Sequence, residues 1–205
     1  KKALACDLAA LIEARDPLIG SRRDDWQSRW LALAELRARR APQGASGSGL
    51  KLIDAAASQW RRRLRCETPP PASVPAHALG DLLLHAFPDR IGKQHEREPL
   101  RYQLSGGRMA RLHPDSTLYG EPWLCASELK FEAKEALILR AAPIDQHRLE
   151  QDFPERFRTC DSVRWDERSH ALVARRERRF DQIVLSSQSG GKVDPEQAAA
   201  ALCAL

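Results

Sequence analysis

The feature that most constrains this chain is a change of hydrophobic period near its middle. Up to about residue 90, apolar side chains recur every three or four residues, as at Leu4, Leu8 and Leu11, which is typical of amphipathic helices. From Tyr102 onward, apolar and polar residues alternate, which indicates β-strands. The change predicts an α+β fold: an N-terminal helical bundle, then a mainly antiparallel β domain, then the start of a further helix.

The strongest strand signal is a hairpin predicted at residues 101–112. Its two short strands flank a three-residue turn, and Gly106 and Gly107 can adopt the positive φ that such turns require. Further strands are predicted at residues 122–127 and 135–140. The following segments are predicted as a short helix at 144–157, a second hairpin with strands at 163–165 and 171–174, a strand at 180–185 and a helix at 198–205.

Prolines and glycines divide the helical part. The predicted helices lie at residues 4–16, 26–40, 50–65 and 75–88, with a flexible loop at 41–49 and a proline-rich spacer at 67–75. We therefore predict three units: a helical domain at residues 1–92, a β domain at 98–187, and a linker with the start of a C-terminal helix at 188–205.

Composition narrows the classes of function. The 205 residues carry 33 basic and 28 acidic side chains, and this mild excess permits nucleic-acid binding without demanding it. The five cysteines are widely spaced, which predicts reduced thiols in a cytoplasmic protein rather than a disulfide framework or a zinc site. No apolar run has the length of a membrane span.

Catalytic motifs are missing from the sequence. The segment at residues 189–193 is similar to a phosphate-binding loop but lacks the required first glycine, where Ser186 stands, and the hydroxyl residue, where Val193 stands. Histidines, cysteines and carboxylates show no metal-binding or nucleophile spacing. We therefore expect no catalytic residues, no metal and no cofactor in this chain.

Arginines are the candidate binding residues. Arg108 and Arg111 lie beside the glycine turn of the first hairpin, where a nucleic-acid backbone can approach closely. Arg175 and Arg176 belong to a run that ends at Arg179. That run is ordinarily a charged strand edge that blocks unwanted pairing, or alternatively a track for phosphates. Three aromatic residues could stack on bases, although core packing is their commoner role: Tyr102, Trp123 and Trp165.

Several phrases in one order resemble a known family. They lie at residues 7–18, 59–64, 82–91, 107–112, 122–124, 141–143, 165–166 and 173–176. Together they resemble the bacterial HrpB family of DEAH-type ATP-dependent RNA helicases, in the region after the two motor domains. The most specific part is the phrase at residues 87–91, Phe-Pro-Asp-Arg-Ile, followed by the glycine hairpin.

The resemblance implies a ratchet-like helical bundle and an oligonucleotide/oligosaccharide-binding (OB)-like barrel that closes over a nucleic-acid channel. The motor motifs, with ATP and Mg, would lie outside this chain, so whether it belongs to an enzyme depends on the parent protein. The resemblance adds Arg90 to the candidate contacts. The implied partners are single-stranded RNA or DNA and the motor domains.

Two alternatives remain open: a scaffold that packs on the motor or on a protein partner, and a small enzyme with an unrecognised site. The sequence does not distinguish RNA from DNA.

Overall fold

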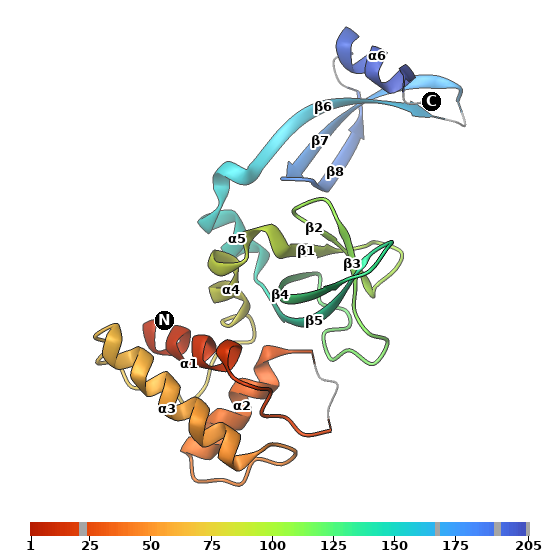
Figure 1. The fold of residues 1–205 in the computed structure, drawn as a ribbon. Coiled ribbons are helices and arrows are strands. Elements are labelled where there is room, and N and C mark those ends of the chain that lie inside the picture. Colours follow the sequence, from red (N-terminus) through yellow and green to blue (C-terminus); the bar gives the residue numbers. More distant parts are fainter. Residues whose placement is uncertain (21–23, 167–168, 191–193, 204–205) are drawn as a thin grey trace.

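The computed structural model describes residues 1–20, 24–166, 169–190 and 194–203. It arranges them as a helical bundle, a β-barrel and a separate three-stranded sheet, with the barrel in the middle (Figure 1). The predicted α+β fold class is therefore confirmed. Parts of three predicted segments lie outside the described residues, namely residues 191–193 of the loop at 189–193, residues 167–168 of the second hairpin's turn and residues 204–205 of the last helix.

The bundle consists of α1 (Lys2–Glu13), α2 (Trp26–Arg37) and α3 (Gly47–Arg63). Asp25 caps α2 by accepting a hydrogen bond from the Ser28 N–H, and the side chain of Ser46 caps α3 by accepting one from the Gly49 N–H. α1 ends at Glu13, three residues before the predicted end at Asp16. The short α4 (Gly80–Ala86) starts later than predicted, because residues 75–79 form turns.

The barrel contains five strands in the closed order β1-β2-β3-β5-β4. They are β1 (Ile91–Gln94), β2 (Arg101–Leu104), β3 (Met109–Arg111), β4 (Trp123–Phe131) and β5 (Ala136–Pro143), and the 3-10 turn η1 (Pro88–Arg90) precedes them. Neighbours pair antiparallel except β3 and β5, whose parallel pairing completes the barrel. This architecture is that of an OB-like barrel.

The second sheet follows α5 (Gln146–Asp152) and the 3-10 turn η2 (Pro154–Arg156). Its order is β6 (Phe157–Asp166), β7 (Ala171–Phe180), β8 (Ile183–Ser189), and α6 (Pro195–Cys203) lies beside it (Figure 1). The strands predicted as one β domain at residues 98–187 thus form two separate sheets. The predicted limits of the three units stay a prediction.

Two strand assignments from the sequence were wrong. β1 was missed, because its four residues follow a helical segment directly and are too few to show a period. The arginine run was expected at a sheet edge, whereas β7 is the middle strand, between β6 and β8. Arginines are tolerated there because solvent reaches both faces of this part of the sheet, as the exposed side chains of Arg175 and Arg176 show.

Two hydrophobic cores hold these parts together. One fills the barrel, around Tyr102, Leu104 and Ile138. The other begins in the bundle at Trp30, continues along α4 and the outside of the barrel to Trp123, and ends at the base of the second sheet, at Phe180. The second core is continuous, so apolar packing connects bundle, barrel and the foot of the sheet. Among the described residues, no helix is long and apolar enough to cross a membrane.

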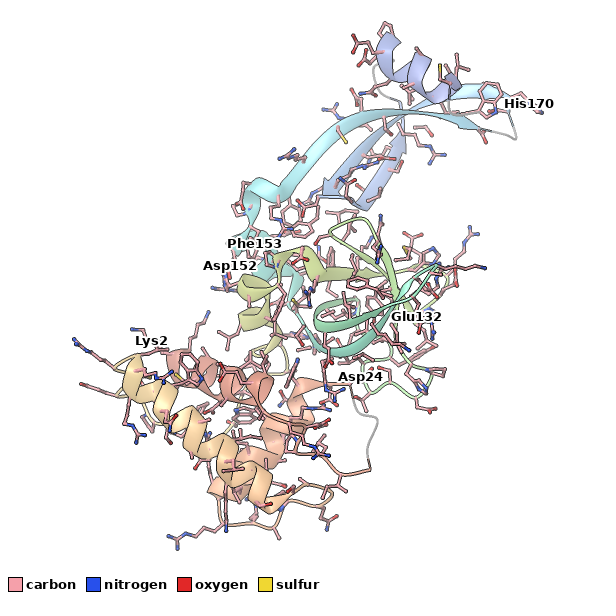
Figure 2. The ribbon with its side chains drawn as sticks, in the orientation of Figure 1. Lys2, Asp24, Glu132, Asp152, Phe153 and His170 are labelled. Atoms are coloured by element: carbon pink, nitrogen blue, oxygen red, sulfur yellow. The ribbon has the colours of Figure 1, made fainter. Side chains whose placement is uncertain are left out.

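Polar contacts also join the bundle to the barrel. Asp16 accepts hydrogen bonds of 2.6 Å from Arg29 of α2 and from Arg140 of β5. The carbonyl of Asp24 accepts a backbone hydrogen bond of 2.9 Å from Ala141, and Figure 2 labels Asp24 at this junction. Burial raises the pKa of Asp16, but the hydrogen bonds and charges of Arg29 and its neighbours outweigh it, so that the net pKa is lowered.

The lowered pKa gives a prediction for acid conditions. Asp16→Asn should lower the free energy of unfolding at pH 7 by about 2 kcal/mol, because buried Arg29 loses its ion pair with the Asp16 carboxylate. Because the pKa of Asp16 is lower in the folded than in the unfolded protein, its ionised carboxylate stabilises the fold at pH values above the unfolded pKa. The difference in unfolding free energy between the variant and wild type should therefore shrink as the pH falls below about 4. Urea titrations between pH 3 and 7 measure this. The exposed Asp115→Asn is the control, and an equal loss in both variants would contradict the prediction.

Candidate nucleic-acid interface

The outer face of β1–β3 carries partly exposed side chains. Strand alternation and register place Lys93, Gln103 and Met109 in one row across the three strands. Arg101 and Arg111 stand directly opposite each other in the next row. We call these five residues the barrel outer face. It carries three cations, and side chains of the opposite pleat, such as Tyr102, fill the interior.

Arg108 lies at the edge of this face, in the turn between β2 and β3. Gly107 in the same turn has φ +90°, as predicted for a glycine hairpin. The Arg108 guanidinium stacks over the ring of Phe131 at 4.8 Å, and Phe131 is 61% exposed. No carboxylate of the described residues forms an ion pair with Arg108. An exposed guanidinium on an exposed aromatic ring is a surface on which a base can stack.

Arg111 is placed differently, because carboxylates surround it. Its guanidinium lies 3.1 Å from Glu132 and 3.4 Å from Glu135. Arg101 binds the same Glu135 at 3.0 Å and Glu98 at 2.7 Å. Hydrogen bonds to Glu98 and Glu135 raise the pKa of Arg101 above its ordinary value. Two cations of the barrel outer face therefore already have anionic partners.

Arg90 lies away from the barrel outer face. It donates a 2.8 Å hydrogen bond to the carbonyl of Ser127 in β4, and it stacks over Phe87 at 5.2 Å. These contacts fix η1 against β4. The structure therefore gives Arg90 a role in holding the fold, and its contact with nucleic acid stays a prediction.

Arg175 and Arg176 point to opposite faces of β7, since neighbouring residues of a strand alternate. Arg175 lines a cavity of about 400 Å³ with Trp165, Glu177 and Ser187. Arg176 stands across from Asp161 of β6 in the register. The other two arginines of the run have carboxylate partners: Arg178 lies 3.4 Å from Glu150, and Arg179 lies 2.6 Å from Glu177.

A second cavity connects the barrel to the three-stranded sheet. It has a volume of about 380 Å³, and Lys93, Arg97, Gln103 and Val184 are among its lining residues. Gln103 donates a 3.0 Å hydrogen bond to the carbonyl of Gln182, in the turn between β7 and β8. The barrel outer face therefore meets the base of the sheet, and Lys93 and Arg97 line this junction.

The aromatic candidates are mostly internal. Tyr102 is fully buried, and its hydroxyl donates a 2.7 Å hydrogen bond to the carbonyl of Glu121. Trp123 is buried against Phe180. Trp165 is half-buried near the second hairpin's turn, beside His170, which Figure 2 labels. The commoner role, core packing, holds for Tyr102 and Trp123.

Sequence reasoning missed Arg97, Arg101 and Phe131. Arg101 could have been found, because a turn centred on Gly106 places residue 101 opposite residue 111. Phe131 could not, because only the barrel brings the end of β4 beside the β2–β3 turn. Among the described residues, no three His, Cys, Asp or Glu side chains are placed to hold a metal ion.

Comparison with known proteins agrees with this architecture. Residues 156–189, which include β6–β8, match the model of the connector region of the ATP-dependent RNA helicase HrpB. Over 121 residues, 58% of this chain and 15% of the relative, the chain is 31% identical to ATP-dependent RNA helicase HrpB of Escherichia coli (strain K12). The crystal structure of E. coli DExH-box NTPase HrpB matches 97% of this chain, with 25% identity and a TM-score of 0.66.

These matches support a C-terminal region similar to that of HrpB-family helicases. A second structure, of the Escherichia coli DEAH/RHA helicase HrpB, matches with 24% identity and a TM-score of 0.63 and supports the same fold. The chain spans about a seventh of the curated HrpB and 22% of each solved HrpB chain. The three-stranded sheet lies in the residues that match the HrpB connector model, and the predicted resemblance to HrpB is confirmed.

Proposed function

We propose that this chain is a non-catalytic accessory region of an ATP-dependent RNA helicase, which contacts single-stranded nucleic acid and packs on the motor domains of the same protein. ATP and Mg would be bound by those domains, and the protein would work in the bacterial cytoplasm. The observation that carries the proposal is the stack of Arg108 on exposed Phe131, at the edge of an OB-like barrel. OB folds bind oligonucleotides on the face of strands 2 and 3 and on adjacent loops.

The exposed cations indicate the path of the single-stranded nucleic acid. Arg108 and Arg97 flank the barrel outer face, and Arg175 and Arg176 extend the set of exposed cations onto the two faces of β7. Cations on neighbouring surfaces can follow a phosphate backbone without reading its sequence. We infer that the region holds the strand while the motor moves it.

Removing the three exposed candidates tests the proposal. Replacing Arg108, Arg175 and Arg176 together with alanine should weaken binding of a labelled 16-nucleotide oligouridine about tenfold at low salt, because three phosphate contacts are lost. The slope of log affinity against log salt should fall by about 2, since each contact contributes about 0.7 for a single strand. Fluorescence anisotropy measures both quantities, and the deoxy oligonucleotide distinguishes RNA from DNA.

A matched control removes the same charge elsewhere. Arg15, Arg40 and Arg62 are exposed arginines of the bundle, and their triple alanine variant should change affinity less than twofold. A wild-type chain that binds no oligonucleotide at low salt would refute direct contact.

That result would favour the alternative, a scaffold without nucleic-acid contact. The ion pairs of Arg101, Arg111, Arg178 and Arg179 support the alternative, because these arginines already have partners within the chain.

A further inference from the structure

The register of β2 and β3 creates an unusual electrostatic arrangement. Arg101 and Arg111 stand directly opposite each other on neighbouring strands, where like charges repel and destabilise the sheet. One carboxylate resolves the repulsion, because Glu135 places Oε2 3.0 Å from the Nε of Arg101 and Oε1 3.4 Å from the Nε of Arg111. The two guanidinium groups thus form an anion site that a side chain of the same protein occupies.

The occupant comes from the turn between β4 and β5. Glu135 directly precedes Ala136, which pairs with Ala110 of β3, so the parallel β3–β5 pairing brings the turn onto the arginine pair. Glu132, labelled in Figure 2, adds a second carboxylate 3.1 Å from Arg111. The same turn begins after Phe131, the ring under Arg108. One hairpin end therefore covers three arginines of the candidate interface.

These ion pairs are accessible to solvent. The side chains of Arg101, Arg111 and Glu132 are each 36% exposed, and that of the bridging Glu135 is 22% exposed. Solvent-exposed ion pairs contribute little to stability, so an external anion can replace a carboxylate at small cost. The planar forks of arginine bind phosphate oxygens in the same bidentate manner as carboxylates.

We propose that Arg101 and Arg111 form a phosphodiester site for the single strand, and that Glu132 and Glu135 are its internal competitors. The inference rests on the proposed function and deepens it, because it assigns a regulatory role to the β4–β5 turn. The nucleic-acid strand must displace the two carboxylates of the turn, and Glu98 from Arg101, before its phosphates reach both arginines. The acidic turn thereby lowers the affinity of the barrel for any single strand and releases the strand readily.

Neutralising the competitors tests the proposal in the 205-residue chain. Glu132→Gln with Glu135→Gln should bind the labelled 16-nucleotide oligouridine about tenfold more tightly than wild type. The salt slope should steepen by about 1.4, because two more phosphates are neutralised. Adding Arg101→Ala and Arg111→Ala to the same variant should abolish the gain, as a double-mutant cycle requires for a direct interaction.

A control separates this effect from net charge. Glu35→Gln with Glu67→Gln adds the same charge on the bundle and should change affinity less than twofold. An equal gain in the control, no gain in the turn variant, or a gain that survives the loss of both arginines would each overturn the inference. Thermal melts must show that the turn variant folds. If it does not fold, Glu135→Gln alone replaces it, with a smaller expected gain in affinity.

The outcomes also distinguish the inference from the proposed function. If the wild type binds through Arg108, Arg175 and Arg176 but the turn variant shows no gain, the inference alone is wrong. If neither the wild type nor the turn variant binds, both are wrong. If the turn variant binds and the wild type does not, direct contact by the wild-type chain is refuted, and the inference, which rests on that contact, is overturned with it.

Discussion

Replacing Gly80 with alanine should lower the free energy of unfolding by about 3 kcal/mol or more, through overpacking. Gly80 is the first residue of α4, and its backbone lies against the end of β5. A Cβ there would stand 2.7 Å from both the carbonyl carbon of Pro143 and the Cγ2 of Ile144, and closer still to the carbonyl oxygen of Pro143. Neither partner is the end of a long flexible side chain, so α4 must move away from the barrel. Urea unfolding measures the loss.

Gly47 provides a matched control for this substitution. It is the first residue of α3, and a Cβ built on it meets nothing within 4 Å. Alanine favours a helix over glycine by up to about 1 kcal/mol, so Gly47→Ala should be neutral or stabilising. Equal effects at the two glycines would contradict the close packing of α4 on β5.

Replacing Asp7 with asparagine should destabilise the bundle by about 3–5 kcal/mol, the usual cost of breaking a buried ion pair. Asp7 is fully buried in α1, and both oxygens accept hydrogen bonds from Arg37, at 2.7 and 2.8 Å. Arg61 of α3 donates another at 2.9 Å. Asparagine keeps the shape but leaves two nearly buried guanidinium groups without their shared anion. The Nε1 of Trp30 lies 3.4 Å from Oδ2 of Asp7, so a change in tryptophan fluorescence reports unfolding of the bundle.

Asp54 is the control for Asp7. It also binds Arg37, at 2.7 Å, but its side chain is 38% exposed. Exposed ion pairs contribute about 1 kcal/mol or less, so Asp54→Asn should have a small effect. A similar loss in both variants would show that burial of Asp7 is not what makes it important.

Much of the secondary structure could be predicted, because local patterns specify it. The glycine turn at Gly106 and Gly107 and the apolar alternation around it were sufficient for the first hairpin. The second helix was predicted at residues 26–40, and the structure places α2 at Trp26–Arg37 with Asp25 as its cap. Such features depend on residues a few positions apart, so no knowledge of the tertiary structure is required.

The candidate interface was predicted only in part. Exposed Arg108, Arg175 and Arg176 were identified from their sequence neighbours, and the structure confirms that solvent reaches them. The anionic partners of Arg111, Glu132 and Glu135, lie more than twenty residues away along the chain. No local pattern indicates such pairs.

The sequence by itself determined the change from helices to strands, the glycine hairpin and the exposed candidates Arg108, Arg175 and Arg176, because each depends on short-range chemistry. Only the tertiary structure decided that the strands divide into a barrel and a connector sheet, and that β7 lies in the middle. It also decided that Glu135 bridges Arg101 and Arg111, because the parallel pairing of β3 with β5 joins segments that are distant in the chain. Strand partners are chosen by long-range packing and by loop closure, which the sequence near a strand does not encode.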